Sequence, residues 1–279
     1  MFELLLSTPK PKMKYKFYMI CVLLFFLAAC FLMRQVFRKK QTSRVWRSFS
    51  AVCAAILFLL CEGFVWLKDV YHAEDKALRY LESSGRVIVN RTANGYQFDG
   101  PGSDSALIFY PGAKVEAEAY APLLYSLAEA GEDVFLVRMP FQIALLGINE
   151  AETLIGNFDY DSWYLAGHSM GGVAAAAYAA KHAEEISGIV YLASYPATDT
   201  DDAVRVLSVY GDQDGVLNMQ AYENSRKYVP PGAQEKVIQG GNHAQFGDYG
   251  EQKGDGKALI PAEEQQKETV KAILYWLGK

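Results

Sequence analysis

The residues most able to do chemistry lie in the segment 163–172, which reads WYLAGHSMGG. It contains a Gly-x-Ser-x-Gly pattern centred on Ser169, between an apolar run and an alanine-rich segment. In this pattern the serine occupies a sharp, strained turn from a strand to a helix, and Gly167 and Gly171 leave room for neighbouring backbone. The turn presents the hydroxyl at the amino end of a helix, where N–H groups can stabilise an oxyanion. The pattern therefore predicts a serine nucleophile.

A serine hydroxyl needs a base within hydrogen-bond reach, and the chain contains four histidines. His72 lies beside a candidate membrane segment, and His182 lies in the charged sequence KHAEE, typical of a solvated helix end. His168 is next to Ser169, but on this turn its side chain points away from the hydroxyl. His243 lies in GGNHAQFG, after the last predicted strand, at the edge where parallel sheets bind their ligands. Elimination therefore selects His243.

The third member of such a site is a carboxylate that fixes the imidazole tautomer and stabilises the imidazolium. The sequence VLSVYGDQDGVLN offers Asp212 and Asp214 just after the penultimate predicted strand. We favour Asp214, because it stands three residues past Gly211, where the turn can bring it toward His243. Asp212 is placed to cap the turn, and Asp248 is a further candidate. The order serine, aspartate, histidine fits the triad order of this strand–turn–helix motif.

An oxyanion hole needs two converging N–H groups, one from the residue after the nucleophile and one from a loop after an early strand. Met170 supplies the first. For the second we choose Ala113, in the sequence FYPGAKVEAEAY. A plainer interpretation is that Pro-Gly at 111–112 only turns the chain, and both can hold. Lys114 is placed to assist an anionic substrate group, although a lone exposed lysine is usually only solvated.

Apolar runs that alternate with helix-like segments predict a doubly wound α/β fold with a mostly parallel sheet, buried on both faces. The predicted strands of this region lie at 105–112, 133–140, 163–169, 187–196, 204–211 and 235–241. Two short alternating runs, 86–90 and 95–100, precede them. Only residues 197–204 separate the strand after the nucleophile helix from the next strand, too few for a helical cap. We therefore expect an open cleft, with Phe141, Tyr195 and Phe246 as candidate substrate-binding residues.

The first 69 residues contain two apolar runs, at 17–33 and about 46–67, each about long enough to cross a hydrocarbon core of ~30 Å. A cleaved signal peptide, or lipidation of Cys30 after processing, are alternatives to two retained helices. We favour retained helices, because a second apolar run follows the first. The basic connector between the runs favours a cytoplasmic location for itself and an extracytoplasmic location for the body.

These patterns divide the chain into a membrane anchor at 1–69 with one or two transmembrane helices, a helical stalk at 70–85 and a catalytic domain at 86–279. Residues 1–69 carry a net charge of +8 and residues 70–279 a net charge of −13. The acidic body argues against nucleic acid as a partner. All four cysteines lie within the first 61 residues, which excludes disulfides and a thiolate nucleophile from the body. We expect neither a metal nor an organic cofactor.

Residues 86–279 resemble an α/β-hydrolase-fold protein, because GHSMGG, YGDQDG and GGNHAQFG stand in the order that this superfamily uses for nucleophile, acid and base. The segments IFYPGAKVEAEAYAPLL, FLVRMPF, LASYP and GGNHAQFGDYGEQKGD resemble the "alpha/beta hydrolase fold-5" group of membrane-anchored bacterial proteins. The resemblance implies a hydrolase carried by Ser169, Asp214 and His243. Proline occupies position 111, where other branches carry a histidine in the oxyanion loop, and this leaves the second donor less defined.

We therefore predict a hydrolase of carboxylic esters, including lipid or lysolipid esters, that works through an acyl-enzyme. The expected partners are a small-molecule or lipid ester and a membrane. Acyl transfer or peptide cleavage by the same three residues is one alternative. A non-catalytic surface binding protein is the other, because a fold does not dictate a function.

Overall fold

The computed structural model describes residues 31 and 35, residues 44–102 and residues 104–279. The chain divides into two compact units, Met1–Val70 and Tyr71–Lys279.

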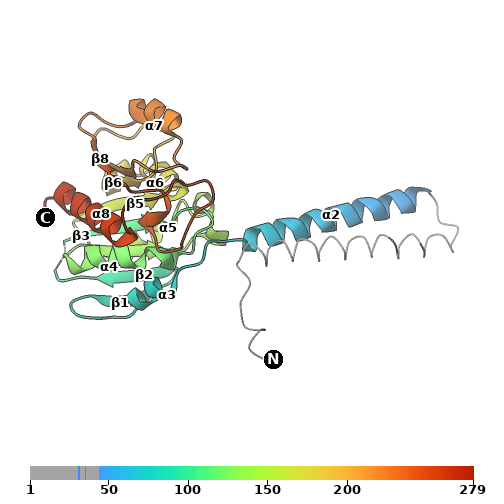
Figure 1. The fold of residues 1–279 in the computed structure, drawn as a ribbon, viewed down its shortest axis with the longest axis horizontal. Coiled ribbons are helices and arrows are strands. Elements are labelled where there is room, and N and C mark those ends of the chain that lie inside the picture. Colours follow the sequence, from blue (N-terminus) through green and yellow to red (C-terminus); the bar gives the residue numbers. More distant parts are fainter. Residues whose placement is uncertain (1–30, 32–34, 36–43, 103) are drawn as a thin grey trace. The chain divides into compact units, whose positions relative to one another are not determined.

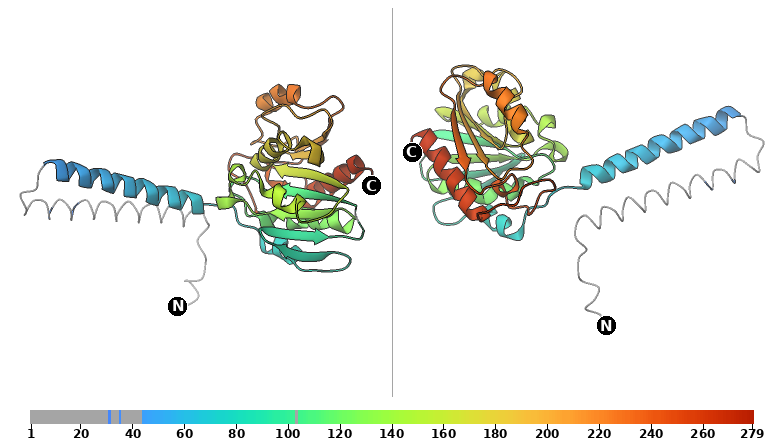
Figure 2. Two further views of the ribbon diagram at one scale, coloured as in Figure 1. Left: turned by 180° about the vertical axis from the view of Figure 1, so that it is seen from behind. Right: turned by 45° about the horizontal axis from the view of Figure 1, so that its top comes forward.

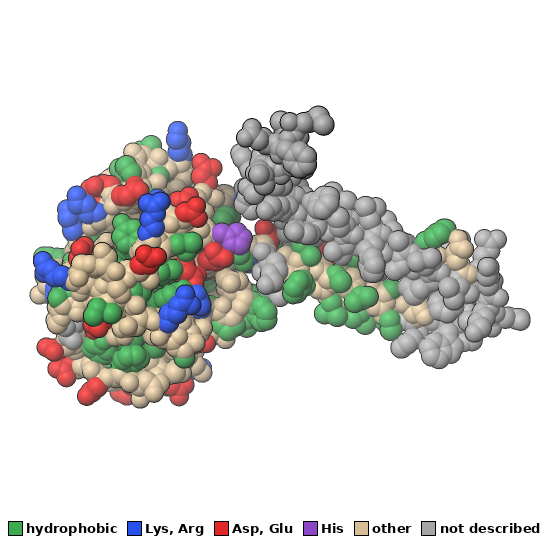
Figure 3. Space-filling view, turned by 90° about the horizontal axis from the view of Figure 1, so that it is seen from below, with side chains coloured by type: hydrophobic (Ala, Val, Ile, Leu, Met, Phe, Trp, Pro, Cys, Tyr) green, Lys and Arg blue, Asp and Glu red, His purple; other side chains and the backbone are tan. Residues whose placement is uncertain are grey.

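The described part of the N-terminal unit consists mainly of helix α2 (Arg44–Lys68), which covers the second apolar run. Its visible face carries hydrophobic side chains (Figure 3). Ile56 and Leu60 are more than half exposed. Among the described residues, no helix combines the length and the apolar character that crossing a membrane requires. The first apolar run, 17–33, lies almost wholly outside the described residues. The anchor at 1–69 and the extracytoplasmic location of the body stay predictions.

The C-terminal unit is built around an eight-stranded sheet with the order β1-β2-β4-β3-β5-β6-β7-β8 (Figure 1). The strands are β1 (Ile88–Thr92), β2 (Gly95–Asp99), β3 (Ser105–Tyr110), β4 (Asp133–Val137), β5 (Ser162–His168), β6 (Ile186–Leu192), β7 (Arg205–Gly211) and β8 (Gln234–Ile238). Strands β1 and β2 pair antiparallel, as do β2 and β4, and all the other pairs are parallel. The mostly parallel α/β sheet predicted from the sequence is confirmed.

Helices and short 3-10 turns connect these strands. The α-helices of the unit are α3 (Asp75–Leu78), α4 (Ala121–Glu129), α5 (Glu150–Ile155), α6 (Met170–Ala179), α7 (Met219–Ser225) and α8 (Ala262–Leu277). The 3-10 helices are η2 (Arg79–Leu81), η3 (Ala117–Tyr120), η4 (Pro140–Gln142), η5 (Ala144–Leu146), η6 (Ala183–Glu185), η7 (Arg226–Tyr228) and η8 (Ala244–Phe246). The residues between β6 and β7 are all described and contain no helix, as expected for a fold without a cap there.

The core lies on both faces of the sheet, with helices α4 and α8 over one face and α5 and α6 over the other (Figure 2). The strand residues alternate between the two layers, because successive side chains on a strand point to opposite faces. Along β3, Leu107 and Phe109 belong to the first layer, and Ile108 and Tyr110 to the second. This double burial explains why the parallel strands are apolar throughout.

The prediction of a stalk helix over 70–85 is wrong, because only a short part of this segment is helical. The segment contains the single turn of α3 and the 3-10 turn of η2, which end at Leu81. Before them, Tyr71 forms an isolated parallel bridge with Val115 and packs against the main core. Tertiary contacts within the C-terminal unit therefore replace the continuous helix that the local sequence favours.

Candidate active site

Backbone strain is concentrated at the carboxyl edge of the sheet. Among the described residues, the non-glycine residues with positive φ are Lys114, Phe141, Gln142, Ser169 and Ala193. Each follows shortly after the end of β3, β4, β5 or β6. Such conformations cost free energy and persist where the surrounding structure enforces them, often at functional sites. The strain therefore marks this edge as the candidate site.

Ser169 occupies the turn between β5 and α6, with φ 52° and ψ −123°. Its N–H donates to the carbonyl oxygen of Leu192 at 2.9 Å, and its own carbonyl oxygen accepts from the Ser194 hydroxyl at 2.6 Å. The flanking glycines are required sterically. A Cβ on Gly171 would lie 2.0 Å from the carbonyl oxygen of Tyr110. The motif thus forms the sharp strand-to-helix turn that its sequence predicts.

His243 and Asp214 come together at the same edge, from the loops after β8 and β7. Nδ1 of His243 lies 2.8 Å from Oδ2 of Asp214, and both side chains are 1% exposed. The other carboxylate oxygen of Asp214 accepts from the N–H groups of Val216 and Leu217 at 2.8 and 2.7 Å. Because the carboxylate faces Nδ1, the proton resides there and Nε2 is the acceptor. Nε2 is buried and has no hydrogen-bond partner in the protein.

The other two candidate carboxylates do not contact His243. Asp212 is exposed and accepts from the N–H of Gly240 at 2.6 Å, which ties the β7 and β8 loops together. Asp248 is buried and pairs with the Lys76 ammonium at 3.1 Å. The structure therefore places Asp214, and neither alternative, beside the imidazole.

The remaining histidines have other partners. Nδ1 of His72 lies 2.8 Å from a carboxylate oxygen of Glu116. The His182 ring stacks on Tyr178, with the ring centroids 4.3 Å apart. The His168 ring is buried on the elbow, and its centroid is 4.5 Å from that of His243.

Asp255 is a residue that sequence reasoning missed. Its carboxylate accepts from the N–H groups of His243 at 3.2 Å and Ala244 at 2.8 Å. It also accepts from the N–H of Gly215, next to Asp214, at 3.0 Å. One carboxylate thus ties the loop after β8, which carries His243, to the loop after β7, which carries Asp214. The available signal was an acidic residue between glycines at 254–256, twelve residues after His243.

The two predicted oxyanion donors lie on neighbouring segments. Met170 is the first residue of α6, and the close contact between Gly171 and Tyr110 brings that helix end against the end of β3. Ala113 lies in the turn that follows β3. The N–H of Lys114 donates to the carbonyl oxygen of Gln142 at 2.7 Å, so the loops after β3 and β4 support each other.

The predicted substrate-binding residues have three different environments. Phe141 is 61% exposed and has a left-handed backbone in the loop after β4. Tyr195 lines a small cavity with residues of α7, such as Tyr222. Phe246 is 0% exposed and packs 5.6 Å from the His168 ring, between ring centroids. Phe246 therefore does not line an open cleft, because tertiary packing buries the ring behind the histidines.

The first residues of the C-terminal unit contact two loops of the candidate site. The N–H of Tyr71 donates to the carbonyl oxygen of Lys114 at 2.6 Å, and its carbonyl accepts from the N–H of Glu116 at 2.9 Å. Lys76 reaches Asp248, in the loop that follows His243. This segment therefore supports both the loop after β3 and the loop after β8.

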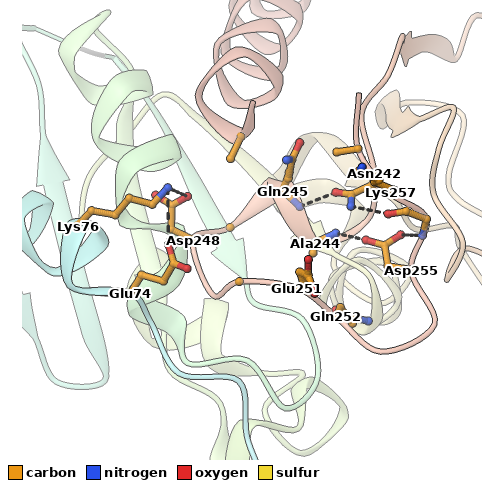
Figure 4. A pocket seen from close by; sticks show the side chains of 15 residues that line it. Glu74, Lys76, Asn242, Ala244, Gln245, Asp248, Glu251, Gln252, Asp255 and Lys257 are labelled. Carbon is orange, nitrogen blue, oxygen red and sulfur yellow. Dashed lines mark hydrogen bonds and ion pairs between the residues drawn. The ribbon is translucent and has the colours of Figure 1, made fainter. Parts of the chain in front are cut away.

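A cavity of about 560 Å³ lies between that segment and the loop after His243 (Figure 4). Its lining includes the charged side chains of Lys76, Asp248, Glu251 and Lys257. Desolvating such groups without new partners costs free energy. The cavity therefore does not suit an acyl chain, although it adjoins the loop that carries His243.

Comparison with known proteins identifies the family. A family model described as the alpha/beta hydrolase family matches residues 106–267, more than half of the chain. The chain belongs to the alpha/beta hydrolase family. No curated protein matches it.

Solved structures share the fold of this alpha/beta hydrolase at low identity. TT1662 from Thermus thermophilus has a TM-score of 0.51 and 15% identity, covering 70% of this chain and 100% of that one. Est1E from Butyrivibrio proteoclasticus, with ferulic acid bound, has a TM-score of 0.51 and 16% identity, covering 69% and 97%. A monoacylglycerol lipase from Paleococcus ferrophilus has a TM-score of 0.51 and 14% identity, covering 68% and 98%. These likenesses concern the fold alone.

We expect the stability of this alpha/beta hydrolase to fall as the pH drops below 6.5. Burial, and then the adjacent His243 ring, lower the pKa of His168 well below its ordinary value of 6.5. The unfolded chain therefore binds a proton that the folded chain excludes, and stability present above pH 6.5 is lost as the pH falls, by at most about 1.4 kcal/mol per pH unit. Urea unfolding at pH 7.5, 6.5 and 5.5 measures this slope. An unchanged slope in His168→Gln would contradict the assignment.

Proposed function

We propose that this alpha/beta hydrolase cleaves carboxylic esters, with Ser169 as nucleophile, His243 as general base and Asp214 as the carboxylate that orients the imidazole. The observation that carries the proposal is the buried Asp214–His243 pair. It leaves Nε2 of His243 without a protein partner, at the sheet edge where the strained turn presents Ser169. A serine, a base and an orienting carboxylate are the parts that acyl transfer requires.

The reaction begins when the Ser169 hydroxyl attacks the ester carbonyl carbon and its proton passes to Nε2 of His243. The carbonyl oxygen becomes an oxyanion, which accepts hydrogen bonds from the N–H groups of Ala113 and Met170. Asp214 stabilises the imidazolium that forms. The intermediate collapses as the imidazolium protonates the leaving alkoxide, which departs as an alcohol and leaves an acyl-enzyme. Water, deprotonated by His243, then attacks the acyl carbon, and the imidazolium returns its proton to the Ser169 oxygen as the acid is released.

Three observations support an ester as the substrate. Est1E has been solved with ferulic acid, and the Paleococcus ferrophilus structure is a monoacylglycerol lipase. The loop after β4 exposes Phe141, Leu145 and Leu146, which are apolar. The segment between β6 and β7, all of whose residues are described, contains no helix. An apolar rim without a helical cap inserted after β6 favours an ester with a hydrophobic acyl group over a polar peptide.

The test is a panel of esters graded by acyl length, run on the full chain and on Ser169→Ala. We expect hydrolysis that depends on Ser169 and favours one range of acyl lengths. A well-folded wild-type chain that hydrolyses no ester of the panel would contradict the proposal. An added acceptor alcohol separates hydrolysis from acyl transfer, because transfer produces a new ester.

A further inference from the structure

The Tyr120 hydroxyl lies between the two segments that carry the proposed oxyanion donors. It accepts from the main-chain N–H of Gly112 at 3.1 Å and lies 2.8 Å from Nδ1 of His168. Gly112 immediately precedes Ala113, and His168 stands two residues before Met170. Tyr120 and His168 are at most 1% exposed, so water does not compete for these contacts. One side chain thus connects the loop after β3 to the nucleophile turn.

The direction of each hydrogen bond follows from which of the atoms carry a proton. The Tyr120 hydroxyl has one proton to donate, and its other contact, the N–H of Gly112, can only donate. Nδ1 of His168 is therefore the acceptor within reach of that proton. Burial raises the pKa of Tyr120 above its ordinary value, and the hydroxyl therefore stays protonated. The His168 ring is neutral, because burial lowers its pKa. His168 consequently carries its proton on Nε2.

Gly112 is closely packed against the atoms that form these hydrogen bonds. A Cβ on Gly112 would lie 2.9 Å from both the Tyr120 oxygen and Nδ1 of His168. Both contacts are shorter than carbon tolerates, so any larger residue would displace the hydroxyl, the imidazole or the loop. The glycine thus permits the loop to approach the bridging hydroxyl.

We propose that Tyr120 is a positioning residue that sets the spacing between the N–H groups of Ala113 and Met170. The inference rests on the proposed function, because this spacing matters for catalysis only where an oxyanion forms. Oxyanion donors act through preorganised geometry, and their displacement weakens transition-state binding more than substrate binding. The loss of a residue that positions these donors therefore affects kcat more than KM.

The kinetic test compares two tyrosine variants of the full chain. Tyr120→Phe is expected to lower kcat at least about tenfold and to change KM less than about threefold. Tyr110→Phe is the matched control, because its buried hydroxyl donates to the carbonyl of Ile148 at 2.8 Å and accepts from the N–H of Ala151 at 3.1 Å. It loses the same kinds of hydrogen bond away from the nucleophile turn, so kcat should stay within about twofold while Tm falls similarly.

If Tyr120→Phe keeps kcat within twofold of Tyr110→Phe, or changes KM alone, the inference is overturned. A second measurement does not need catalysis. Nitrogen-15 NMR of histidine-labelled chain, which has only four histidines, reports the tautomer of each ring. We expect His168 protonated on Nε2 in the wild type, and a proton on Nδ1 would contradict the direction of the hydrogen bond from Tyr120 to His168. Ester hydrolysis that fails in the wild type, with this tautomer present, would contradict the proposed function and leave the hydrogen-bond chain standing.

Discussion

His243→Ala is expected to lower kcat by roughly 10⁴- to 10⁶-fold, which is the cost of removing the base from a serine, histidine and carboxylate set. The large effect follows from the geometry. The imidazole is held by Asp214 on Nδ1, and no other histidine contacts that carboxylate. Steady-state kinetics with the preferred ester of the panel measure the loss.

His182→Ala is the control for that variant. The His182 ring stacks on Tyr178 and pairs loosely with Glu185, away from the loops that carry the site. We expect kcat within about twofold of the wild type. A loss of activity in His182→Ala together with normal activity in His243→Ala would show that the base is misassigned.

Asp214→Asn is expected to lower kcat on the order of 10⁴-fold with a folded protein. The substitution keeps the size of the side chain, and its remaining oxygen can still accept from Val216 and Leu217. The amide nitrogen then faces Nδ1 of His243 and donates to it. The imidazole is forced into the tautomer with its proton on Nε2, where it cannot accept the serine proton.

Asp212→Asn is the matched control, two residues away on the same loop. Asp212 is exposed, and asparagine retains the oxygen that accepts from Gly240. We expect kcat within a few-fold of the wild type. Equal losses of kcat in the two variants would mean that disturbing the loop, rather than losing the carboxylate of Asp214, lowers the activity.

The elements that carry the chemistry could be predicted because their signals are local. The turn at Ser169 needs glycines beside it, and β3 alternates between two buried layers, so both leave clear patterns in the sequence. The choice of Asp214 over Asp212 followed from its distance past the end of β7. The contact that the structure shows between Asp214 and His243 is consistent with that choice.

What escaped prediction depends on contacts between distant segments. Asp255 acts on loops that are eleven to forty residues away, and no local pattern marks a carboxylate that accepts main-chain N–H groups. Phe246 resembles a rim residue in sequence, yet packing against His168 buries it. The stalk prediction failed for the same reason. Hydrogen bonds from Tyr71 to the loop after β3 hold the chain in an extended conformation there, although the local sequence favours a helix.

The central claim is that Ser169 is activated by His243, and covalent labelling tests it most directly. The full chain is incubated with a fluorophosphonate, and intact-mass spectrometry follows the rate of adduct formation. We predict one adduct on Ser169, none in Ser169→Ala, and slower labelling by several orders of magnitude in His243→Ala. Folded wild-type protein that takes up no label, or labelling that persists in Ser169→Ala, would contradict the account.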